Sequence, residues 1–192
     1  MQAAFDDGYI PLGQPFPRIL EAARAGGEWA WSELYHAIAP DLLRYLRARG
    51  IADPEDVVGE TFLRVVRSAN AFDGDGAAFR AWVFTIGRNV AIDAVRYRAK
   101  RPEEHREDLS DLGPTGDVET DALAGLLQTD VRHVLEGLSD DQRDVLVLRF
   151  LSDLSFAEIA EIMGKREGTV RMIQNRGLAT LRSKLSEGRV TS

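Results

Sequence analysis

The sequence predicts an all-α protein of two small helical domains, a helical bundle and a helix-turn-helix, joined by an acidic flexible linker. Three observations carry this prediction. Apolar residues recur at intervals of three and four on both sides of the linker, which is the period of amphipathic helices. No segment alternates apolar and polar residues over a sustained stretch, as a half-buried strand would. An acidic, Pro- and Gly-containing stretch separates the two helical parts.

The composition limits the classes of protein that the chain can belong to. Its 192 residues are 44% hydrophobic and 29% charged, which is typical of a globular protein with a buried core. It has no cysteine, which excludes disulfides and thiolate zinc sites and fits a cytoplasmic protein. The three histidines do not pair at ligand spacing, and no other cluster suggests a ligand, so we expect no metal and no cofactor. Neither a membrane-length apolar run nor a signal peptide is present, which predicts no membrane insertion.

The first part of the chain contains a tail and a bundle. Residues 1–27 hold many Gly and Pro residues, and we expect an extended N-terminal tail there. Residues 28–101 form the first domain. Within it, Asp53 is the expected N-cap of a helix that begins at Pro54 and runs to about Asn70, because Pro is favoured at the first helical position. A Gly-rich break then precedes a long helix, whose apolar stripe contains Phe79, Val83, Ile86 and Val90.

The second part begins after the linker. Residues 102–130 hold nine acids against the single base Arg106, and we expect a flexible tether. Residues 131–187 form the second domain, with about four helices. Capping boxes mark two of their starts, Ser139 with Gln142 and Ser155 with Glu158.

Two basic segments stand out in this acidic chain. Its net charge of −7 is unfavourable for binding DNA at long range, because DNA affinity comes mainly from Lys and Arg neutralising phosphates. However, residues 80–101 hold six basic residues against the single acid Asp93, and residues 165–189 hold seven against two. Each segment can therefore face nucleic acid.

The second basic segment completes a helix-turn-helix. A short helix over residues 155–163, a turn at Gly164 and a longer helix from Gly168 to about Leu185 have the required lengths. Projected on a helical wheel, Val170, Ile173, Gly177, Leu181 and Lys184 lie near the apolar seam. The opposite side can face DNA and carries Arg171, Met172, Asn175, Arg176, Ala179 and Arg182. A solvated face of a helical bundle is the alternative interpretation.

The first basic segment has a polar strip that suits single-stranded bases. Trp82, Thr85, Asn89, Arg96 and Lys100 lie along one side of the long helix, next to the loop over residues 72–78. Aromatic and amide groups can stack on and hydrogen-bond to unstacked bases, and basic residues can follow the backbone. Core packing is the preferred interpretation of Phe79, while for Trp82 core packing and base stacking both stay open.

Four ordered blocks carry a family resemblance. They are Asp53-x-x-Asp56-x-x-x-Glu60-x-Phe62; Phe79-x-x-Trp82-x-x-x-Ile86-x-Arg88-Asn89-x-x-x-Asp93-x-x-Arg96; Leu138-x-x-x-Gln142-Arg143; and Gly168-Thr169-Val170-Arg171. The chain resembles the extracytoplasmic-function sigma factors of bacterial RNA polymerase. The resemblance implies a non-enzymatic factor that directs core polymerase to promoters and assists melting. It implies that the first domain binds the polymerase clamp and the minus-ten element, and that the second reads the minus-thirty-five element.

The resemblance also assigns residues and partners. It implies contacts of Asp56, Glu60 and Phe62 with the clamp. The minus-ten set is Phe72, Asp73, Gly74, Trp82, Arg88, Asn89, Arg96 and Lys100, with Asn89 and the 72–78 loop capturing a flipped base. The minus-thirty-five set is Arg166, Gly168, Thr169, Arg171, Met172, Asn175, Arg176 and Arg182. The implied partners are the core polymerase clamp and flap, promoter DNA and an anti-sigma protein. Gly59 replaces the usual Gln, which weakens its helix by up to about 1 kcal/mol.

Two other classes of protein explain the sequence less well. A stand-alone helix-turn-helix regulator, with an N-terminal sensor or dimerisation domain, leaves Arg88, Asn89 and the strip unexplained. An enzyme has little support, because the sequence contains no phosphate-binding Gly loop, no clustered metal ligands and no ordered Ser, His and Asp signature.

Overall fold

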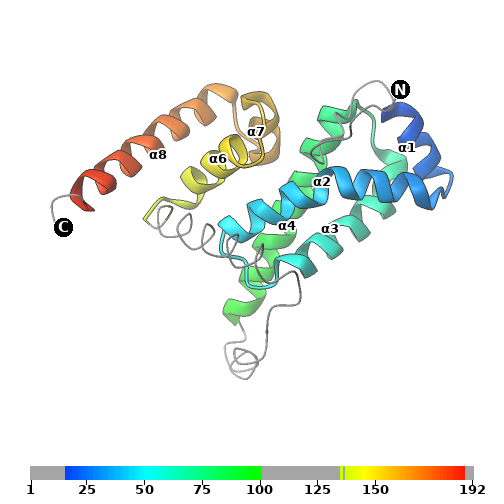
Figure 1. Ribbon diagram of the computed structural model, residues 1–192, viewed down its shortest axis with the longest axis horizontal. Helices are drawn as coiled ribbons and strands as arrows, with labels where there is room; N and C mark the ends of the chain where they lie inside the picture. The colour runs from blue at the N-terminus through cyan, green and yellow to red at the C-terminus, as the bar shows by residue number, and fades with distance from the viewer. Residues whose placement is uncertain (1–15, 101–134, 136, 189–192) are drawn as a thin grey trace, which may run out of the picture.

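In the computed structural model, residues 16–100, 135 and 137–188 are described (Figure 1). Within these ranges every regular element is a helix, which confirms the all-α prediction. None of the described helices combines the length and the apolar character that a membrane span needs.

The first domain contains α1 (Phe16–Arg24), α2 (Glu28–Ala48), α3 (Pro54–Ser68), the short 3-10 helix η1 (Ala69–Ala71) and α4 (Gly76–Lys100). α3 and α2 pack on α4, and their apolar stripes form the core. α4 approaches α2 closely at Gly87, where a Cβ atom would lie 2.8 Å from Leu42 Cδ1. The long helix with the predicted strip is therefore held firmly from two sides.

The structure corrects the prediction for the N-terminal tail. We expected an extended segment over residues 1–27, but α1 occupies Phe16–Arg24. Phe16, Leu20 and Ala23 are buried along one side of this helix, and the Phe16 ring lies 5.3 Å from the Phe79 ring. Burial of this side against the bundle stabilises a nine-residue helix that would be marginal alone. Residues 1–15 lie outside the described ranges.

The start and the end of α3 also differ from the prediction. Its N-cap residue is Asp53, as expected, but the carboxylate makes no capping hydrogen bond. Asp53 instead forms an ion pair with Arg98 of α4, so tertiary contact has taken the side chain away from the helix end. The α-helix ends at Ser68, and η1 tightens the last turn before the loop.

The second domain contains α6 (Asp140–Phe150), α7 (Phe156–Met163) and α8 (Glu167–Gly188). Both predicted capping boxes are present: the backbone N–H of Gln142 donates to Ser139 Oγ at 3.3 Å, and that of Glu158 to Ser155 Oγ at 3.2 Å. Gly164 ends α7 with φ +61°, the left-handed conformation expected of the turn. The predicted linker at residues 102–130, and the span of a fourth helix apart from Leu135 and residues 137–138, lie outside the described ranges.

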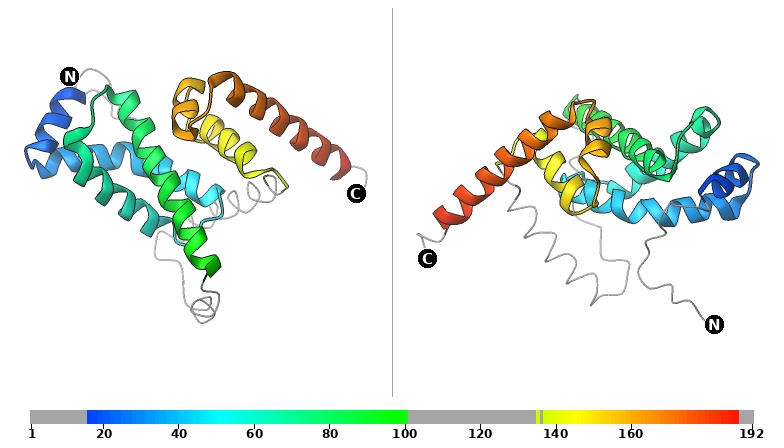
Figure 2. Two further views of the ribbon diagram at one scale, coloured as in Figure 1. Left: turned by 180° about the vertical axis from the view of Figure 1, so that it is seen from behind. Right: turned by 90° about the horizontal axis from the view of Figure 1, so that it is seen from above.

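The two domains are in contact. α7 packs along α4, and α6 touches α2, while α8 projects away from the first domain (Figures 1 and 2). The buried apolar residues of both domains form one continuous cluster. The sequence suggested two units connected only by a tether, whereas the structure has a shared interface between them.

Candidate nucleic-acid interface

The two sides of α8 are divided as the helical wheel predicted. Val170 and Gly177 are buried, Ile173 and Leu181 are half-buried, and Lys184, which was expected on the seam, is exposed. α8 approaches α6 closely at Gly177, where a Cβ atom would lie 3.0 Å from Leu146 Cδ1 and would push on that side chain. The opposite side is exposed along its length and consists of Arg171, Met172, Asn175, Arg176, Ala179 and Arg182.

The N-terminus of α8 is open to a ligand. Arg166 and Gly168 are exposed, Thr169 is half-buried, and a Cβ atom on Gly168 would meet no neighbour within 4 Å. The Arg166 carbonyl accepts hydrogen bonds from the backbone N–H groups of Thr169 at 2.9 Å and Val170 at 3.1 Å. These two N–H groups are used within the first turn, and the positive dipole end of the helix beside the open Gly168 position can attract an anion such as a DNA phosphate.

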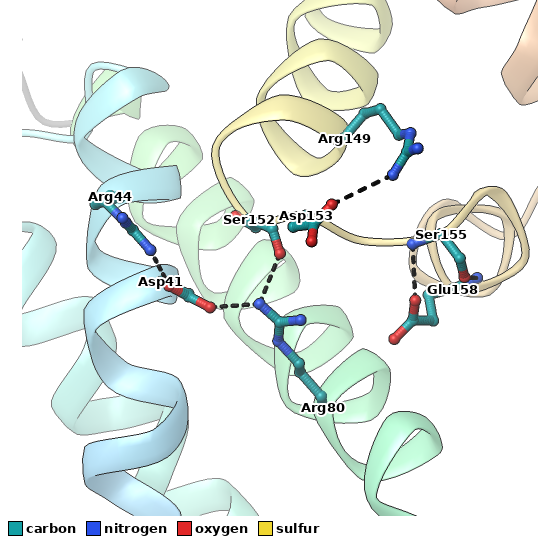
Figure 3. Close-up of polar contacts among 8 residues, drawn as sticks. All are labelled: Asp41, Arg44, Arg80, Arg149, Ser152, Asp153, Ser155 and Glu158. Atoms are coloured by element: carbon teal, nitrogen blue, oxygen red, sulfur yellow. Dashed lines mark hydrogen bonds and ion pairs between the residues drawn. The ribbon is translucent and has the colours of Figure 1, made fainter. Parts of the chain in front are cut away.

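Arg171 is held in place by an aromatic ring that the sequence reasoning missed. Its guanidinium lies 4.1 Å from the centre of the Phe156 ring and donates to Glu167 Oε1 at 2.5 Å. Arg149 lies over the same ring at 5.4 Å and pairs with Asp153 at 3.6 Å (Figure 3). The only sequence signal was an aromatic residue at the first position of α7. The stacking pre-organises Arg171 on the exposed side of the domain.

A pocket of about 400 Å³ lies beside the predicted minus-ten strip. It is lined by Arg64, Ser68, Ala71, Phe72, Trp82, Ile86 and Asn89, from α3, η1, the following loop and α4. The Phe72 ring is 5.0 Å from the Trp82 ring, and the Trp82 ring is 5.6 Å from the Phe79 ring. Phe79 is fully buried, which confirms its core role, whereas half-buried Trp82 both packs on the core and lines the pocket. Arg64 and Ser68 were not predicted.

The loop before α4 is tightly folded. A Cβ atom on Gly74 would lie 2.9 Å from Phe72 Cζ, so a larger residue would displace the ring. Asp75 Oδ1 accepts a hydrogen bond from the Ala78 N–H at 2.8 Å and thereby caps α4. Asp73 and Gly74 are exposed, as are Asn89, Arg96 and Lys100 farther along the helix.

Arg88 lies apart from the rest of the minus-ten set. Its Nε donates to Asp144 Oδ2 of α6 at 3.0 Å, so its side chain is directed at the second domain and away from the pocket. Asp144 is fully buried and also accepts hydrogen bonds from Tyr45 Oη at 2.8 Å and from Arg49. Burial raises the pKa of Tyr45 well above its ordinary value of 10.0, and the Asp144 charge raises it further.

A second polar contact joins the domains. Arg80 of α4 pairs with Asp41 of α2 and donates to the Ser152 carbonyl at 2.6 Å, in the α6–α7 connection (Figure 3).

Arg49, beside Asp144, is held charged. Burial alone would lower the pKa of Arg49, but Asp144 and its neighbours raise it. The sequence reasoning missed Asp144, Tyr45, Arg49 and Arg80, since no local pattern relates residues so far apart.

The three predicted clamp contacts do not share one environment. Asp56 is exposed, and Glu60 is half-buried and accepts from Arg64 Nε at 2.7 Å. Phe62, however, is buried and packs against the Tyr35 ring at 4.7 Å, so its role is to hold α3 in the core. The outer side of α3 instead exposes Leu63 and Val66, which are 53% and 47% accessible.

The second domain has an apolar groove between α6 and α8. It has a volume of about 130 Å³ and is lined by Leu135, Leu146, Val147, Phe150, Leu151, Leu178 and Leu181. Phe150, at 59% exposure, lies at its edge. Among the described residues, no group of three or more acids or histidines could hold a metal ion.

Comparison with known proteins gives relatives that match both domains. The family model Sigma-70 region 2 matches residues 34–101, and Sigma-70, region 4 matches residues 134–183. The chain is 34% identical to the ECF RNA polymerase sigma factor BldN of Streptomyces coelicolor, over 85% of this chain and 63% of BldN. It is 31% identical to the RNA polymerase sigma factor CarQ of Myxococcus xanthus, over 88% of this chain and 96% of CarQ. The solved structure of CnrH in complex with the cytosolic domain of CnrY is similar, with a TM-score of 0.69 at 26% identity, covering 88% of this chain and 96% of CnrH.

Proposed function

The chain belongs to the extracytoplasmic-function sigma factors of RNA polymerase, and on that premise we propose how its residues divide the work of promoter recognition. The protein directs core polymerase to promoters and has no catalytic site of its own. It acts in the cytoplasm, where polymerase and chromosomal DNA meet. The observation that carries the proposal is the pocket beside Asn89, which combines aromatic walls with hydrogen-bonding groups next to a basic helix end.

The pocket captures a minus-ten base that has left the duplex. Its aromatic side chains, Phe72 and Trp82, give a surface on which a flat base can pack, and Asn89, Ser68 and Arg64 supply donors and acceptors for its edge. Flipping a base costs a few kcal/mol, which these contacts offset. Arg96 and Lys100, exposed on the same helix, then follow the strand backbone.

The exposed side of α8 reads the minus-thirty-five element in the major groove. Arg171 and Asn175 are nearest the helix N-terminus and suit base edges, because Arg pairs with guanine and Asn with adenine. Arg166 and Arg182 lie toward the two ends and contact phosphates. The Phe156 platform fixes Arg171, so less side-chain entropy is lost on binding.

Polymerase and an inhibitor bind the remaining surfaces. The outer side of α3, with Asp56, Glu60, Leu63 and Val66, contacts the clamp, and the α6–α8 groove receives an apolar segment of the flap. An anti-sigma protein is a further partner. The complex of the relative CnrH with the cytosolic domain of CnrY supports it, since that relative matches most of this chain.

Run-off transcription with purified core polymerase tests the proposal. A genomic library of promoter fragments supplies the templates, and transcripts should appear only when core and this protein are both present. Free protein should bind the same duplexes weakly, because its net charge of −7 repels DNA at long range. Specific binding by free protein, without stimulation of core polymerase, would instead indicate a stand-alone regulator.

A further inference from the structure

One anion-binding site on the first domain is filled by a residue of the second. Tyr45 of α2, Arg49 at the C-cap of α2 and Arg88 of α4 all donate to the Asp144 carboxylate of α6. Tyr45 and Asp144 are fully buried, and the side chains of Arg49 and Arg88 are 11% and 19% exposed. The three donors, which we call the anion site, thus belong to one domain, whereas the anion comes from the other.

The contact is charge-assisted and shielded from water. Two guanidinium groups share one carboxylate, with Arg49 on Oδ1 and Arg88 on Oδ2. Hydrogen bonds between ionised groups are stronger than neutral ones, and burial limits screening by salt. When the domains separate, Asp144 must leave, and the anion site is left with two positive charges and a free hydroxyl.

We propose that the anion site binds a backbone phosphate of promoter DNA when the domains separate, so that Asp144 and DNA compete for the same three donors. A phosphate has the same anionic oxygen acceptors as a carboxylate, and guanidinium groups match the geometry of both. In the structure described here, Asp144 occupies the place of the phosphate. Domain closure therefore masks a DNA contact, and DNA binding favours the open form.

The position of the anion site favours DNA over other anions. Arg88 directly precedes Asn89, which lines the base pocket, so the anion site and the pocket lie on adjacent sides of the same turn of α4. Arg96 and Lys100 continue the positive charge toward the end of the helix. A strand whose base enters the pocket carries phosphates on either side of it, one of which the anion site can hold. This inference rests on the proposed DNA-binding function.

The first experiment measures domain opening. Because the chain has no native cysteine, dyes can be attached at the exposed positions Glu33 and Glu161 after replacement by Cys, one in each domain. Asp144→Asn leaves the two arginines without their counter-charge, so the open fraction measured by energy transfer should rise at least about tenfold. The control is Asp153→Asn, which makes the same chemical change on a 97% exposed side chain.

The second experiment measures DNA binding by the opened molecule. Asp144→Asn should bind a short labelled single-stranded oligonucleotide more tightly than the wild type. Adding Arg49→Gln to that variant should weaken binding and reduce the salt slope by about 0.7, the value for one phosphate contact on a single strand. The control is Arg47→Gln in the same background, which removes an equal charge from α2 outside the anion site and should have a smaller effect.

Three outcomes would overturn the proposal. If the Asp144→Asn variant has the same open fraction as the wild type, the competition between Asp144 and DNA is refuted. Equal effects of Arg49→Gln and Arg47→Gln on DNA would refute the phosphate contact. Arg49-dependent binding of a poly-glutamate peptide, with DNA binding unchanged, would assign the anion site to an acidic protein. If Asp144→Asn does not fold, Arg80→Gln removes the hydrogen bond to the Ser152 carbonyl of the second domain and leaves the anion site intact. This variant should raise the open fraction and tighten DNA binding, and a more open variant without tighter DNA binding would overturn the proposal. Failure of the proposed function would appear separately, as wild-type protein that does not support transcription by core polymerase.

Discussion

Replacing Asn89 separates promoter melting from protein stability. Asn89 is exposed on α4, lines the base pocket and forms no side-chain hydrogen bond with another described residue. Asn89→Ala should therefore leave the free energy of unfolding unchanged or raise it by up to about 0.7 kcal/mol, because Ala is the better helix former. Loss of one or two hydrogen bonds to a captured base should cost about 1–2 kcal/mol, which lowers the open-complex population roughly 5- to 30-fold.

Paired templates provide the assay for this prediction. Open complexes are counted by permanganate footprinting on a normal duplex and on a duplex whose minus-ten region is already mismatched. Mismatches remove the unpairing cost in advance, so they should restore most of the activity of Asn89→Ala. Asn70→Ala is the matched control, since Asn70 is also exposed but does not line the pocket.

A different pattern would refute the base-capture role of Asn89. If Asn89→Ala lowers the melting temperature and stays inactive on the mismatched template, the side chain stabilises α4 and does not hold a base. Thermal unfolding followed by circular dichroism, run beside the transcription assay, distinguishes the two roles.

Three further predictions concern α8, the glycines of the first domain and the interface. Arg171→Ala should weaken binding of the minus-thirty-five element by about 1–3 kcal/mol and relax the preference at one base pair. Arg182→Ala should weaken binding to all promoter sequences alike. If both variants show the same pattern of affinities across a set of altered promoters, these roles are wrong. Gly59→Ala should raise the free energy of unfolding by up to about 1 kcal/mol, because Ala favours the helix and a Cβ atom there meets no neighbour. Gly87→Ala should lower the free energy of unfolding by about 1–2 kcal/mol, because its Cβ atom would overlap with Leu42. Urea denaturation measures both changes. Because the folded-state pKa of Tyr45 is raised, its contribution to stability is complete below pH 10.0 and is lost as the pH rises toward that pKa. Tyr45→Phe should remove this loss of stability at alkaline pH. If the stability of Tyr45→Phe falls with alkaline pH as that of the wild type does, the prediction is wrong.

The sequence determined the local elements and the two sides of the recognition helix. Capping boxes at Ser139 and Ser155 depend on residues three apart, and the left-handed turn at Gly164 depends on one residue, so both can be recognised without a fold. The exposed side of α8 follows from a period of 3.6 residues. The helix α1 was missed because its nine residues are helical through burial against the bundle, which no local signal reveals.

Only the tertiary structure decided which polar residues meet. Trp82 and Asn89 were predicted from one helix, but the pocket also needs Arg64 and Ser68 of α3, which approach only after packing. The family resemblance placed Arg88 in the minus-ten set, yet its partner Asp144 lies 56 residues away and in another domain. Tyr45 is 99 residues from that carboxylate. Periodicity and caps relate residues within a few turns, whereas the burial of a charge depends on how whole domains pack.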